Sequence, residues 1–546
     1  MLRIWTRSVH LAVALSLFSS PGLAATFYVA PGGNDANPGT LAAPLATPGR
    51  AIALASPGDT ILLRAGSYPI TSSLQIRQTG LTLASYPGER ARIVGGTSDV
   101  TNLTSIVIVY ASHVTIQGLE LEGASYYGVK LDELYGPQPG IRLSGLYIHH
   151  TGRDGIKVQQ ADDVVIEDCE IGFTGVRDAS NAEGIDVMGI IGGLIRRNYI
   201  HDTATNGLFV KGGSRNVLVE ANRIERTGYS GILLGSESDA VFMRNGVLPE
   251  ASDSVARNNI VVDAAYSGLG SIAGENIRFE NNTVINAARI GQAMFRAVPN
   301  QYDTPTRGVA LYNNIFVLTP GSSRPMVHLY DYVGALESDS NIWFSLDGRY
   351  QFWSESTAGA NNYWTSLAQW RSGMNVDGSS QAVDPRLDAA SVYFPLADSP
   401  AIDQGVTSGY VTTDFDGTPR PQGVAYDIGA HERTGDVVPP PVEPPPVEPP
   451  PAPVVPSAPG SLTAVQATRT SVALTWIDTS DNEEGFRIEQ SINGAAFTVI
   501  ATVGAGSQSR TVNGVKRNKT YTFRVVAYNA AGVSGYSNAA SITIAR

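Results

Sequence analysis

The sequence predicts an all-β protein: a right-handed parallel β-helix, then a proline-rich linker and a β-sandwich. Two sequence ladders in shared register predict the β-helix, which is a solenoid of stacked coils. The first ladder repeats a polar residue, a glycine and alternating apolar positions, with steps of 23 to 37 residues between glycines. Its glycines are Gly128, Gly155, Gly184, Gly207, Gly231 and Gly268. The second reads apolar-x-x-Asn-x-apolar, at Asn198, Asn222, Asn258, Asn282, Asn314 and Asn341.

Each coil is predicted to contain two short strands with Gly and Asn at its corners. Asparagine tolerates the left-handed backbone of a tight corner, and stacked amides bond to one another. Leu119, Leu146 and Cys169 take the Asn position in earlier coils. Cys169 is the only cysteine, which excludes an internal disulfide, and we expect it to fill the core.

The first half of the chain divides into a leader, a cap and the coils. Residues 1–25 have the charged start, apolar centre and small-residue end of a secretory signal peptide. Residues 26–435 form the predicted β-helix domain. Residues 26–72 are its N-terminal cap, with a helix near Pro48 to Leu54 that covers the first coil. Residues 73–113 form less regular coils and 114–345 the regular solenoid. An insertion from Ser236 to Asp253 lengthens one coil and could wall a cleft.

The C-terminal part contains four further segments. Residues 346–377 contain four aromatic side chains, Trp353, Tyr363, Trp364 and Trp370. These side chains either form a platform that binds sugar rings or pack against the solenoid. Residues 378–435 resemble the closing segment called choice-of-anchor Q; their acidic residues either hold a cation or form turns and pair with arginines such as Arg420. Residues 436–457 are a Pro/Val/Glu spacer. Residues 458–546 have short alternating strands and resemble a fibronectin type III domain through Trp476 and Tyr521.

Composition and charge restrict the possible partners. The formal net charge of −12 argues against nucleic acid and anionic membranes as partners. No segment after the leader is long and apolar enough to span a bilayer. We therefore expect a secreted, extracellular bacterial protein that acts as a monomer. An acidic protein that binds a polyanion needs cations to mediate the contact.

Aligning the coils on their glycines predicts a polar cluster on the outside of the solenoid. Side chains alternate along a strand and coils lie about 4.8 Å apart, so residues of neighbouring coils meet on one face. The alignment brings together Asp154, Lys157, Glu183, Asp186 and Lys211. Carboxylates without nearby His or Cys suit a hard cation, above all Ca²⁺.

The lysines supply the second part of the predicted chemistry. A lysine with a lowered pKa removes the proton beside the carboxylate of a uronate, and elimination of the 4-linked sugar follows. Lys211 is the candidate base, because Gly212 and Gly213 leave room for a substrate chain beside it. Lys157 is a second catalytic candidate. Lys130 and Arg215 are candidates for binding the acidic substrate.

This region resembles the family 9 polysaccharide lyases, which are β-helical, Ca²⁺-dependent pectate lyases. The resemblance rests on Asp154-Gly-Ile, Glu183-Gly-Ile-Asp186 and Asn206-Gly-Leu-Phe-Val-Lys211. It implies that Asp154, Glu183 and Asp186 bind Ca²⁺ and that a lysine of the next coil is the base. Ala182 stands where the family has a further Asp, and the family's lysine corresponds to Phe209, two residues before Lys211. The Lys211 coil also resembles the family 6 lyases, which include alginate lyases.

Three other functions are compatible with the same residues. A glycoside hydrolase would use Glu183 with Asp154 or Asp186 as paired carboxylates. A non-catalytic carbohydrate-binding or adhesion protein is favoured by Ala182, the shifted lysine and the fibronectin-like module. An epimerase begins with the same proton abstraction, but the sequence has no Asp-Pro-His-Asp segment of the alginate epimerase kind. The leading interpretation is a lyase that cleaves an acidic polysaccharide.

Overall fold

The structure is a computed structural model that describes residues 24–96, 103–132, 136–246, 248–319, 324–359, 361–434, 455–480, 482–529 and 531–545. The chain divides into two compact units, residues 1–437 and 438–546. Residues 1–23 of the predicted signal peptide and residues 436–454 of the predicted linker lie outside the described residues.

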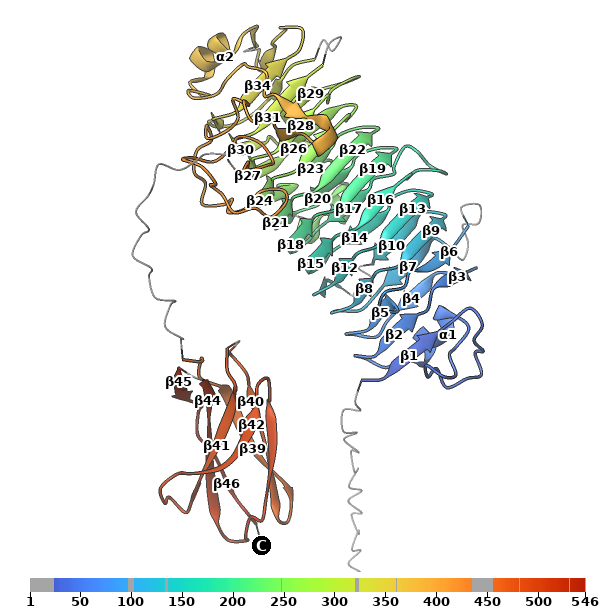
Figure 1. The fold of residues 1–546 in the computed structure, drawn as a ribbon, viewed down its shortest axis with the longest axis vertical. Coiled ribbons are helices and arrows are strands. Elements are labelled where there is room, and N and C mark those ends of the chain that lie inside the picture. Colours follow the sequence, from blue (N-terminus) through green and yellow to red (C-terminus); the bar gives the residue numbers. More distant parts are fainter. Residues whose placement is uncertain are drawn as a thin grey trace, which may run out of the picture. The chain divides into compact units, whose positions relative to one another are not determined.

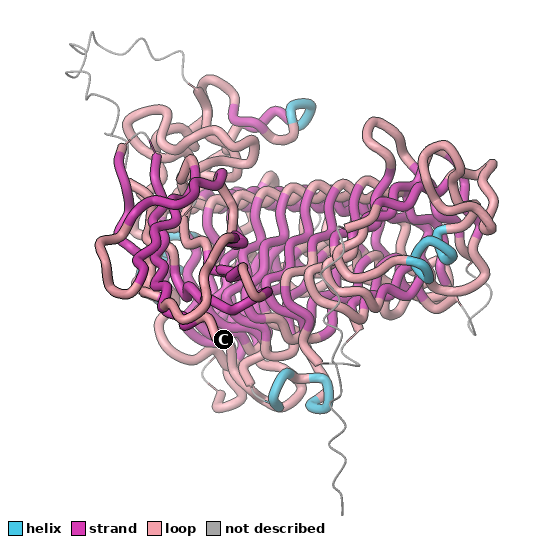
Figure 2. Tube along the Cα trace, turned by 90° about the horizontal axis from the view of Figure 1, so that it is seen from below, coloured by secondary structure: helices cyan, strands magenta, loops and turns pink. Residues whose placement is uncertain are grey.

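The first unit is a parallel β-helix with three strands in each regular coil, one in each of three long sheets (Figure 1). Strands of successive coils stack side by side in these sheets (Figure 2). The prediction of two strands per coil is therefore wrong. The corner between β18 (Ile191–Arg196) and β19 (Tyr199–Thr203) contains only Arg197 and Asn198, so two strands read as one apolar segment in the sequence.

The 13-stranded sheet contains, in spatial order, β1 (Thr26–Val29), β2 (Thr60–Leu63), β5 (Thr82–Ser85), β8 (Thr115–Gln117), β12 (Arg142–Ser144), β15 (Ala161–Glu167), β18, β21 (Ser214–Glu220), β24 (Ala251–Arg257), β27 (Gly274–Glu280), β30 (Arg307–Tyr312) and β33 (Glu337–Asp339), with β11 (Gln138–Pro139) beside β15. The 11-stranded sheet contains β3 (Gly66–Pro69), β6 (Ala91–Val94), β9 (Glu120–Ala124), β13 (Tyr147–Thr151), β16 (Glu170–Gly172), β19, β22 (Arg223–Thr227), β25 (Ile260–Val262), β28 (Thr283–Ile285), β31 (Ile315–Leu318) and β34 (Ile342–Ser345).

The 12-stranded sheet carries the candidate site. It contains β4 (Leu74–Ile76), β7 (Ser105–Val109), β10 (Tyr127–Leu131), β14 (Ile156–Gln159), β17 (Ile185–Met188), β20 (Leu208–Lys211), β23 (Ile232–Leu234), β26 (Ser267–Ile272), β29 (Ala293–Val298), β32 (Val327–Tyr330), β35 (Phe352–Glu355) and β36 (Asn362–Trp364). All neighbours in it are parallel except β35 and β36. The residues after the ladder glycines point into the core and are buried, as predicted: Val129, Ile156, Ile185, Leu208, Ile232 and Leu269.

The ladder glycines provide space rather than an unusual backbone. None of the six has a positive φ. A Cβ on Gly155 would lie 2.4 Å from Ile171 Cγ2 and 2.8 Å from the carbonyl oxygen of Gly184. The other five glycines meet an equivalent Ile or Val and the backbone of the next coil. Close packing between coils therefore explains why glycine recurs at these positions.

The asparagine ladder stabilises the corner between the 13- and 11-stranded sheets. Each buried amide donates to the next one at 2.9–3.1 Å. The ladder contains Asn198, Asn222, Asn259, Asn282, Asn314 and Asn341. Asn259 replaces the predicted Asn258, because Ala256 pairs with both Val219 and Phe279 and thereby sets the register. The left-handed residue is the one before each ladder position, such as Asn258 (φ 54°).

The two ends of the solenoid are covered by short helices. The predicted cap helix is α1 (Pro48–Leu54), which begins after the N-cap Thr47 and buries Ala51 and Ile52. At the other end, α2 (Leu367–Met374) buries Trp370, whose ring stacks on Phe352 at 5.1 Å. Trp370 therefore packs against the solenoid instead of forming a sugar platform, whereas Tyr363 is 55% exposed.

The closing segment lies on the outer face of the 11-stranded sheet. Its short elements are β37 (Leu387–Asp388), η4 (Ala389–Ser391) and β38 (Phe394–Pro395). Its Ile428 and Ala430 pack with Ile260 and Ile315 of that sheet. Arg420 forms a fully buried ion pair with Glu432 at 2.9 Å. Glu432 thus pairs with arginine, as one of the two alternatives predicted, whereas Asp414 and Asp416 lie with His431 in a group that could hold a metal ion.

The second unit is a β-sandwich. One sheet contains β39 (Gly460–Thr468), β40 (Ser471–Ile477) and β43 (Ser509–Asn513). The other contains β41 (Gly485–Ile492), β42 (Thr498–Gly504), β44 (Thr520–Asn529), β45 (Gly532–Tyr536) and β46 (Ala540–Thr543). Trp476 and Phe486 lie in its core, and the Tyr521 hydroxyl accepts a hydrogen bond from the Lys516 N–H at 2.8 Å. This contact is the tyrosine corner expected of such sandwiches.

Candidate active site

The candidate site lies on the outer side of the 12-stranded sheet, where β14, β17 and β20 meet. Strand register sets Lys157 opposite Asp186, and Asp186 opposite Phe209. Asp154 and Glu183 stand just before β14 and β17. The predicted cluster is therefore present, but it is not open to solvent: Asp186 is 0% and Phe209 3% exposed.

Three carboxylates form the centre of this cluster. One oxygen from each of Asp154, Glu183 and Asp186 lies within 4.8 Å of the others. Asp154 Oδ1 accepts a hydrogen bond from the Glu183 N–H (3.1 Å), and Glu183 Oε1 accepts one from Thr205 (2.7 Å). Burial, followed by the nearby Glu183 carboxylate, raises the pKa of Asp154 well above its usual value.

The other oxygens of these carboxylates have no hydrogen-bond partner. Asp154 Oδ2, Glu183 Oε2 and Asp186 Oδ1 are all buried and without a hydrogen bond within the described residues. Buried carboxylate oxygens without a partner are costly, and a hard cation satisfies several at once. The donor set therefore fits Ca²⁺. Among the described residues, the ammonium of Lys157 also lies beside these carboxylates and would compete with a metal ion for them.

Lys157 is already paired within the cluster. Its ammonium forms an ion pair with Asp186 Oδ2 and lies 3.9 Å from Asp154 Oδ2. Burial lowers the pKa of Lys157 to about 8, although the nearby carboxylates oppose this shift. Lys157 therefore neutralises part of the charge that a metal ion would otherwise neutralise.

Lys211 is the less restrained of the two lysines. Its Nζ donates to the Glu237 carbonyl oxygen at 3.3 Å and lies 4.2 Å from the centre of the Phe209 ring. Burial lowers the pKa of Lys211 below its usual value, with the surrounding carboxylates acting in the opposite direction. Because its only described hydrogen bond is to a carbonyl, Lys211 can lose its proton without breaking an ion pair.

A cleft runs beside these residues. It consists of two hollows, of about 460 Å³ and 410 Å³, which share Asn181, Lys211 and Glu237 in their linings. Lys157 lines the first hollow and Glu183 the second. Part of the predicted insertion, residues 236–246, forms a wall of the first hollow and is called the wall segment below; it includes η2 (Ala240–Phe242) and η3 (Arg244–Gly246).

The wall segment is fixed by two charged groups that the sequence did not indicate. The fully buried Glu250 accepts hydrogen bonds from the N–H groups of Gly212 and Ser238, both at 2.9 Å, and from the Ser238 hydroxyl. Arg244 forms an ion pair with Asp162 of β15. These contacts hold the wall segment above Lys211.

The structure separates the two predicted substrate-binding residues from the cleft lining. Lys130 stands opposite Lys157 on β10 but pairs with Asp132 at 2.6 Å and lines neither hollow. Arg215 is not part of this face. The chain turns at Gly212 and Gly213 into β21 of the 13-stranded sheet, where Arg215 is exposed. Arg215 therefore lies on a different sheet from the cluster and lines neither hollow, and its role in substrate binding stays a prediction.

Arg296 is the cationic residue of the cleft that sequence reasoning missed. It lies on β29, opposite Gly270, and lines the second hollow. The repeat that would have aligned it is lost in the sequence, because its coil has Met294 in place of the ladder glycine. Ala293 pairs with Ser267 and Phe295 with Leu269, which leaves Met294 opposite Gly268. The register between β26 and β29 places it in the column of Lys157 and Asp186.

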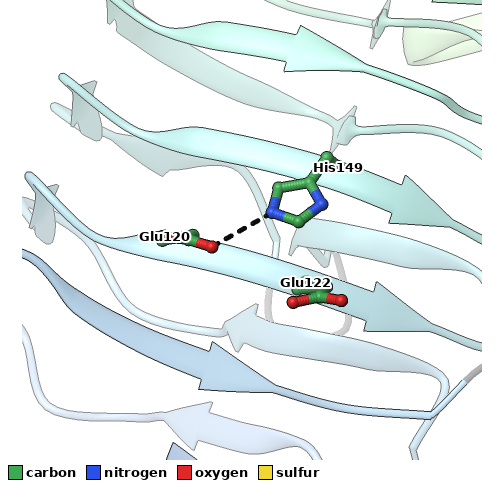
Figure 3. Close-up of side chains that lie close together, drawn as sticks. All are labelled: Glu120, Glu122 and His149. Atoms are coloured by element: carbon green, nitrogen blue, oxygen red, sulfur yellow. Dashed lines mark hydrogen bonds and ion pairs between the residues drawn. The ribbon is translucent and has the colours of Figure 1, made fainter. Parts of the chain in front are cut away.

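A second group of possible ligands lies on the 11-stranded sheet. Glu120 and Glu122 of β9 face His149 of β13, and His149 Nε2 lies 3.3 Å from Glu120 (Figure 3). Arg92 of β6 forms ion pairs with both glutamates. Because this arginine already neutralises the carboxylates, the group is a weaker candidate for a metal than the Asp154 cluster.

Three segments of the chain are similar to known protein families. Residues 27–188 match the family described as Pel9A-like, right handed beta helix region, and residues 133–314 match a right handed beta helix region. Residues 457–543 match the fibronectin type III domain. Residues 27–188 are thus similar to the Pel9A-like β-helix family, and residues 457–543 to the fibronectin type III domain. The predicted fold class and the predicted resemblance are confirmed.

Individual relatives of the Pel9A-like β-helix are distant or partial. Pectate lyase PEL9 of Emericella nidulans is 45% identical over 64 residues, which cover 12% of this chain and 16% of that enzyme. The crystal structure of pectate lyase Pel9A covers 75% of this chain and 96% of its own at 15% identity, with a TM-score of 0.47. An alginate lyase from Paenibacillus sp. covers 57% and 99% at 19% identity, with a TM-score of 0.37.

The α-helices described in the structure are short. Among the described residues, no helix has both the length and the apolar character needed to cross a bilayer. The longer of the two α-helices, α2, has 8 residues.

Proposed function

We propose that this protein is a secreted polysaccharide lyase that cleaves an acidic, uronate-containing polysaccharide by Ca²⁺-assisted β-elimination. The observation that carries the proposal is the buried carboxylate cluster with three unpaired oxygens, set beside two lysines at the edge of one cleft. The Pel9A-like family match supports the same class of reaction.

Asp154, Glu183 and Asp186 would hold the cation. A cation held by these residues would supply positive charge that offsets the carboxylates of protein and uronate and makes the proton on the carbon beside the uronate carboxylate more acidic. The negative charge of the protein then no longer opposes a polyanionic substrate. Lys157, through its contacts with Asp186 and Asp154, positions these carboxylates.

Lys211 would act as the general base. Its lowered pKa increases the fraction of neutral amine, which accepts the C5 proton of the uronate. The C–H electron pair forms the C4–C5 double bond, the C4–O bond breaks, and the departing sugar oxygen takes a proton from water. The wall segment lines the hollow beside Lys211 and contacts its ammonium through the Glu237 carbonyl oxygen.

A hydrolase is less well supported by the geometry. Retaining glycosidases hold their carboxyl groups about 5–5.5 Å apart and inverting enzymes about 6.5–9.5 Å. The ligand oxygens of Asp154, Glu183 and Asp186 all lie within 4.8 Å of one another and are buried. This spacing suits joint binding of one cation better than attack on a glycosidic bond from two sides.

Product analysis tests the proposed function against its alternatives. The purified protein is incubated with polygalacturonate, alginate and chondroitin sulfate, each with Ca²⁺ or chelator. Mass spectrometry then measures the length and end groups of the products, and NMR measures the uronate stereochemistry. Elimination gives shorter chains with an unsaturated end and no added water. Addition of one water at each cleaved bond would indicate a hydrolase. Unchanged chain length with altered uronate stereochemistry would indicate an epimerase. A polymer that is unchanged in both respects would indicate a binding protein.

A further inference from the structure

The second hollow is lined by a half-buried cation, Arg296, that has no counter-ion among the described residues. The guanidinium of Arg296 forms no ion pair or hydrogen bond with the residues that the structure describes, and its Nε is fully enclosed. Its side chain passes over Gly270, where a Cβ would lie 2.9 Å from Arg296 Cγ. Burial lowers the pKa of Arg296 to about 10, and Glu237 only partly opposes this.

An unpaired charge that is partly buried is unfavourable for folding. Arginines withdrawn from solvent are normally paired with carboxylates. The described acid that acts most on Arg296 is the exposed Glu237, which forms no ion pair with it. Arg296 therefore has the character of a group whose partner is a ligand.

The surroundings of Arg296 indicate what kind of ligand this is. The floor between Lys211 and Arg296 is apolar, formed by Phe209, Leu233 and Ile272. Tyr229 and Tyr266, with ring centres 4.8 Å apart, line the same hollow. Aromatic and apolar groups beside a fixed cation suit a sugar ring that carries an anionic group.

We propose that Arg296 binds the carboxylate of a uronate residue in the substrate chain at a distance from the cleaved bond, with Tyr229 and Tyr266 against the sugar rings. Four strand steps separate β17 from β29, which is about 19 Å along the solenoid at 4.8 Å per strand. The ligand is thus a polymer or long oligosaccharide. This subsite rests on the proposed function, because it presumes that the cleft binds an acidic polysaccharide.

Binding measurements test the subsite without requiring turnover. The full-length Lys211→Ala protein is compared with Lys211→Ala/Arg296→Met in Ca²⁺, by titration with polygalacturonate and alginate oligosaccharides and with methyl-esterified polygalacturonate. The matched control is Arg307→Met, which removes an exposed arginine on β30. Adding Arg296→Met to the Lys211→Ala parent should lower the affinity for an acidic oligosaccharide about tenfold or more, as for loss of a charge-assisted hydrogen bond. Adding Arg307→Met should not. Affinity for the esterified polymer should not change.

Stability separates a ligand-binding arginine from a structural one. Because Arg296 has no hydrogen-bond or ion-pair partner in the described part of the chain, Arg296→Met should leave the thermal unfolding midpoint unchanged or raise it. A lower midpoint, or unchanged affinity for every acidic oligosaccharide, would overturn the subsite. Failure of the parent protein to bind any acidic oligosaccharide would overturn it as well. Arg296-dependent binding without unsaturated products from wild-type protein would overturn only the lyase proposal.

Discussion

Lys157 and Asp186 stand opposite each other on neighbouring strands and form an ion pair that is almost completely buried, with side-chain exposures of 12% and 1%. The pair leaves Asp186 Oδ1 and one oxygen each of Asp154 and Glu183 without a hydrogen bond. The cluster thus holds three carboxylates but only one lysine in contact with them. This imbalance leads to the first three predictions.

Ca²⁺ should stabilise the folded protein. A ligand that binds only the native state at 100 times its Kd adds about 2.7 kcal/mol to the free energy of unfolding. We expect Ca²⁺ to raise the thermal unfolding midpoint of wild-type protein and to have little effect on Glu183→Gln. Glu120→Gln, in the group of possible ligands on the 11-stranded sheet, is the matched control and should respond like wild type. Equal responses of all three proteins would place Ca²⁺ binding elsewhere.

Lys157→Met should make stability depend on the cation. Removing one partner of a buried ion pair costs about 3–5 kcal/mol, so the variant should unfold at lower temperature in chelator. Ca²⁺ should then stabilise it more than it stabilises wild type, because no ammonium competes for the carboxylates. The half-exposed pair of Lys130 provides the control: Lys130→Met should cost under about 1 kcal/mol. An unchanged midpoint for Lys157→Met in chelator would contradict this account.

Asp154→Asn should stabilise the metal-free protein at neutral pH. The pKa of Asp154 is raised in the folded state, so the folded protein binds more protons than the unfolded chain at pH values above 3.8. Stability therefore falls as pH rises from 3.8 through the raised pKa. The neutral amide lacks this penalty. Chemical denaturation in chelator at several pH values measures the difference, and a variant less stable than wild type near neutrality would refute the prediction.

Glu250→Ala should loosen the wall segment. It leaves the N–H groups of Gly212 and Ser238 without their acceptor in a buried setting, which costs about 3–5 kcal/mol. We also expect a raised KM, because the wall segment lines the cleft beside Lys211. Glu275→Ala, at an exposed position of β27, should change neither quantity. Normal stability together with normal KM in Glu250→Ala would show that the wall segment is held by other contacts.

Periodicity in the sequence predicts the coils, because core positions recur with each turn of the solenoid. The placement of Asp154, Glu183 and Asp186 in one cluster follows from aligning three short glycine motifs. The error at Asn258 arose where Asn258 and Asn259 are adjacent, since only strand pairing determines which one faces inward. The third strand of each coil was missed because its corner is only two residues long.

Contacts between distant segments carry no comparable sequence signal. Arg215 follows Lys211 closely in sequence but lies on another sheet, because the chain turns a corner at Gly212 and Gly213. Glu250 and Arg296 belong to the site through a long insertion and a coil without the repeat motif. Burial of Asp186 and Phe209 likewise depends on neighbouring segments that cover an outward-facing strand.

The central proposal is that Lys211 acts as the base of a Ca²⁺-assisted elimination. The most direct measurement is the initial rate of unsaturated-end formation on the acidic polymer that the protein cleaves, with Ca²⁺ and with chelator, for wild type, Lys211→Ala and the exposed-lysine control Lys519→Ala. We predict a Ca²⁺-dependent rate that falls about 10²–10⁴-fold in Lys211→Ala, as for loss of a general base, and is unchanged in Lys519→Ala. A Lys211→Ala rate equal to wild type, or full activity in chelator, would contradict the account.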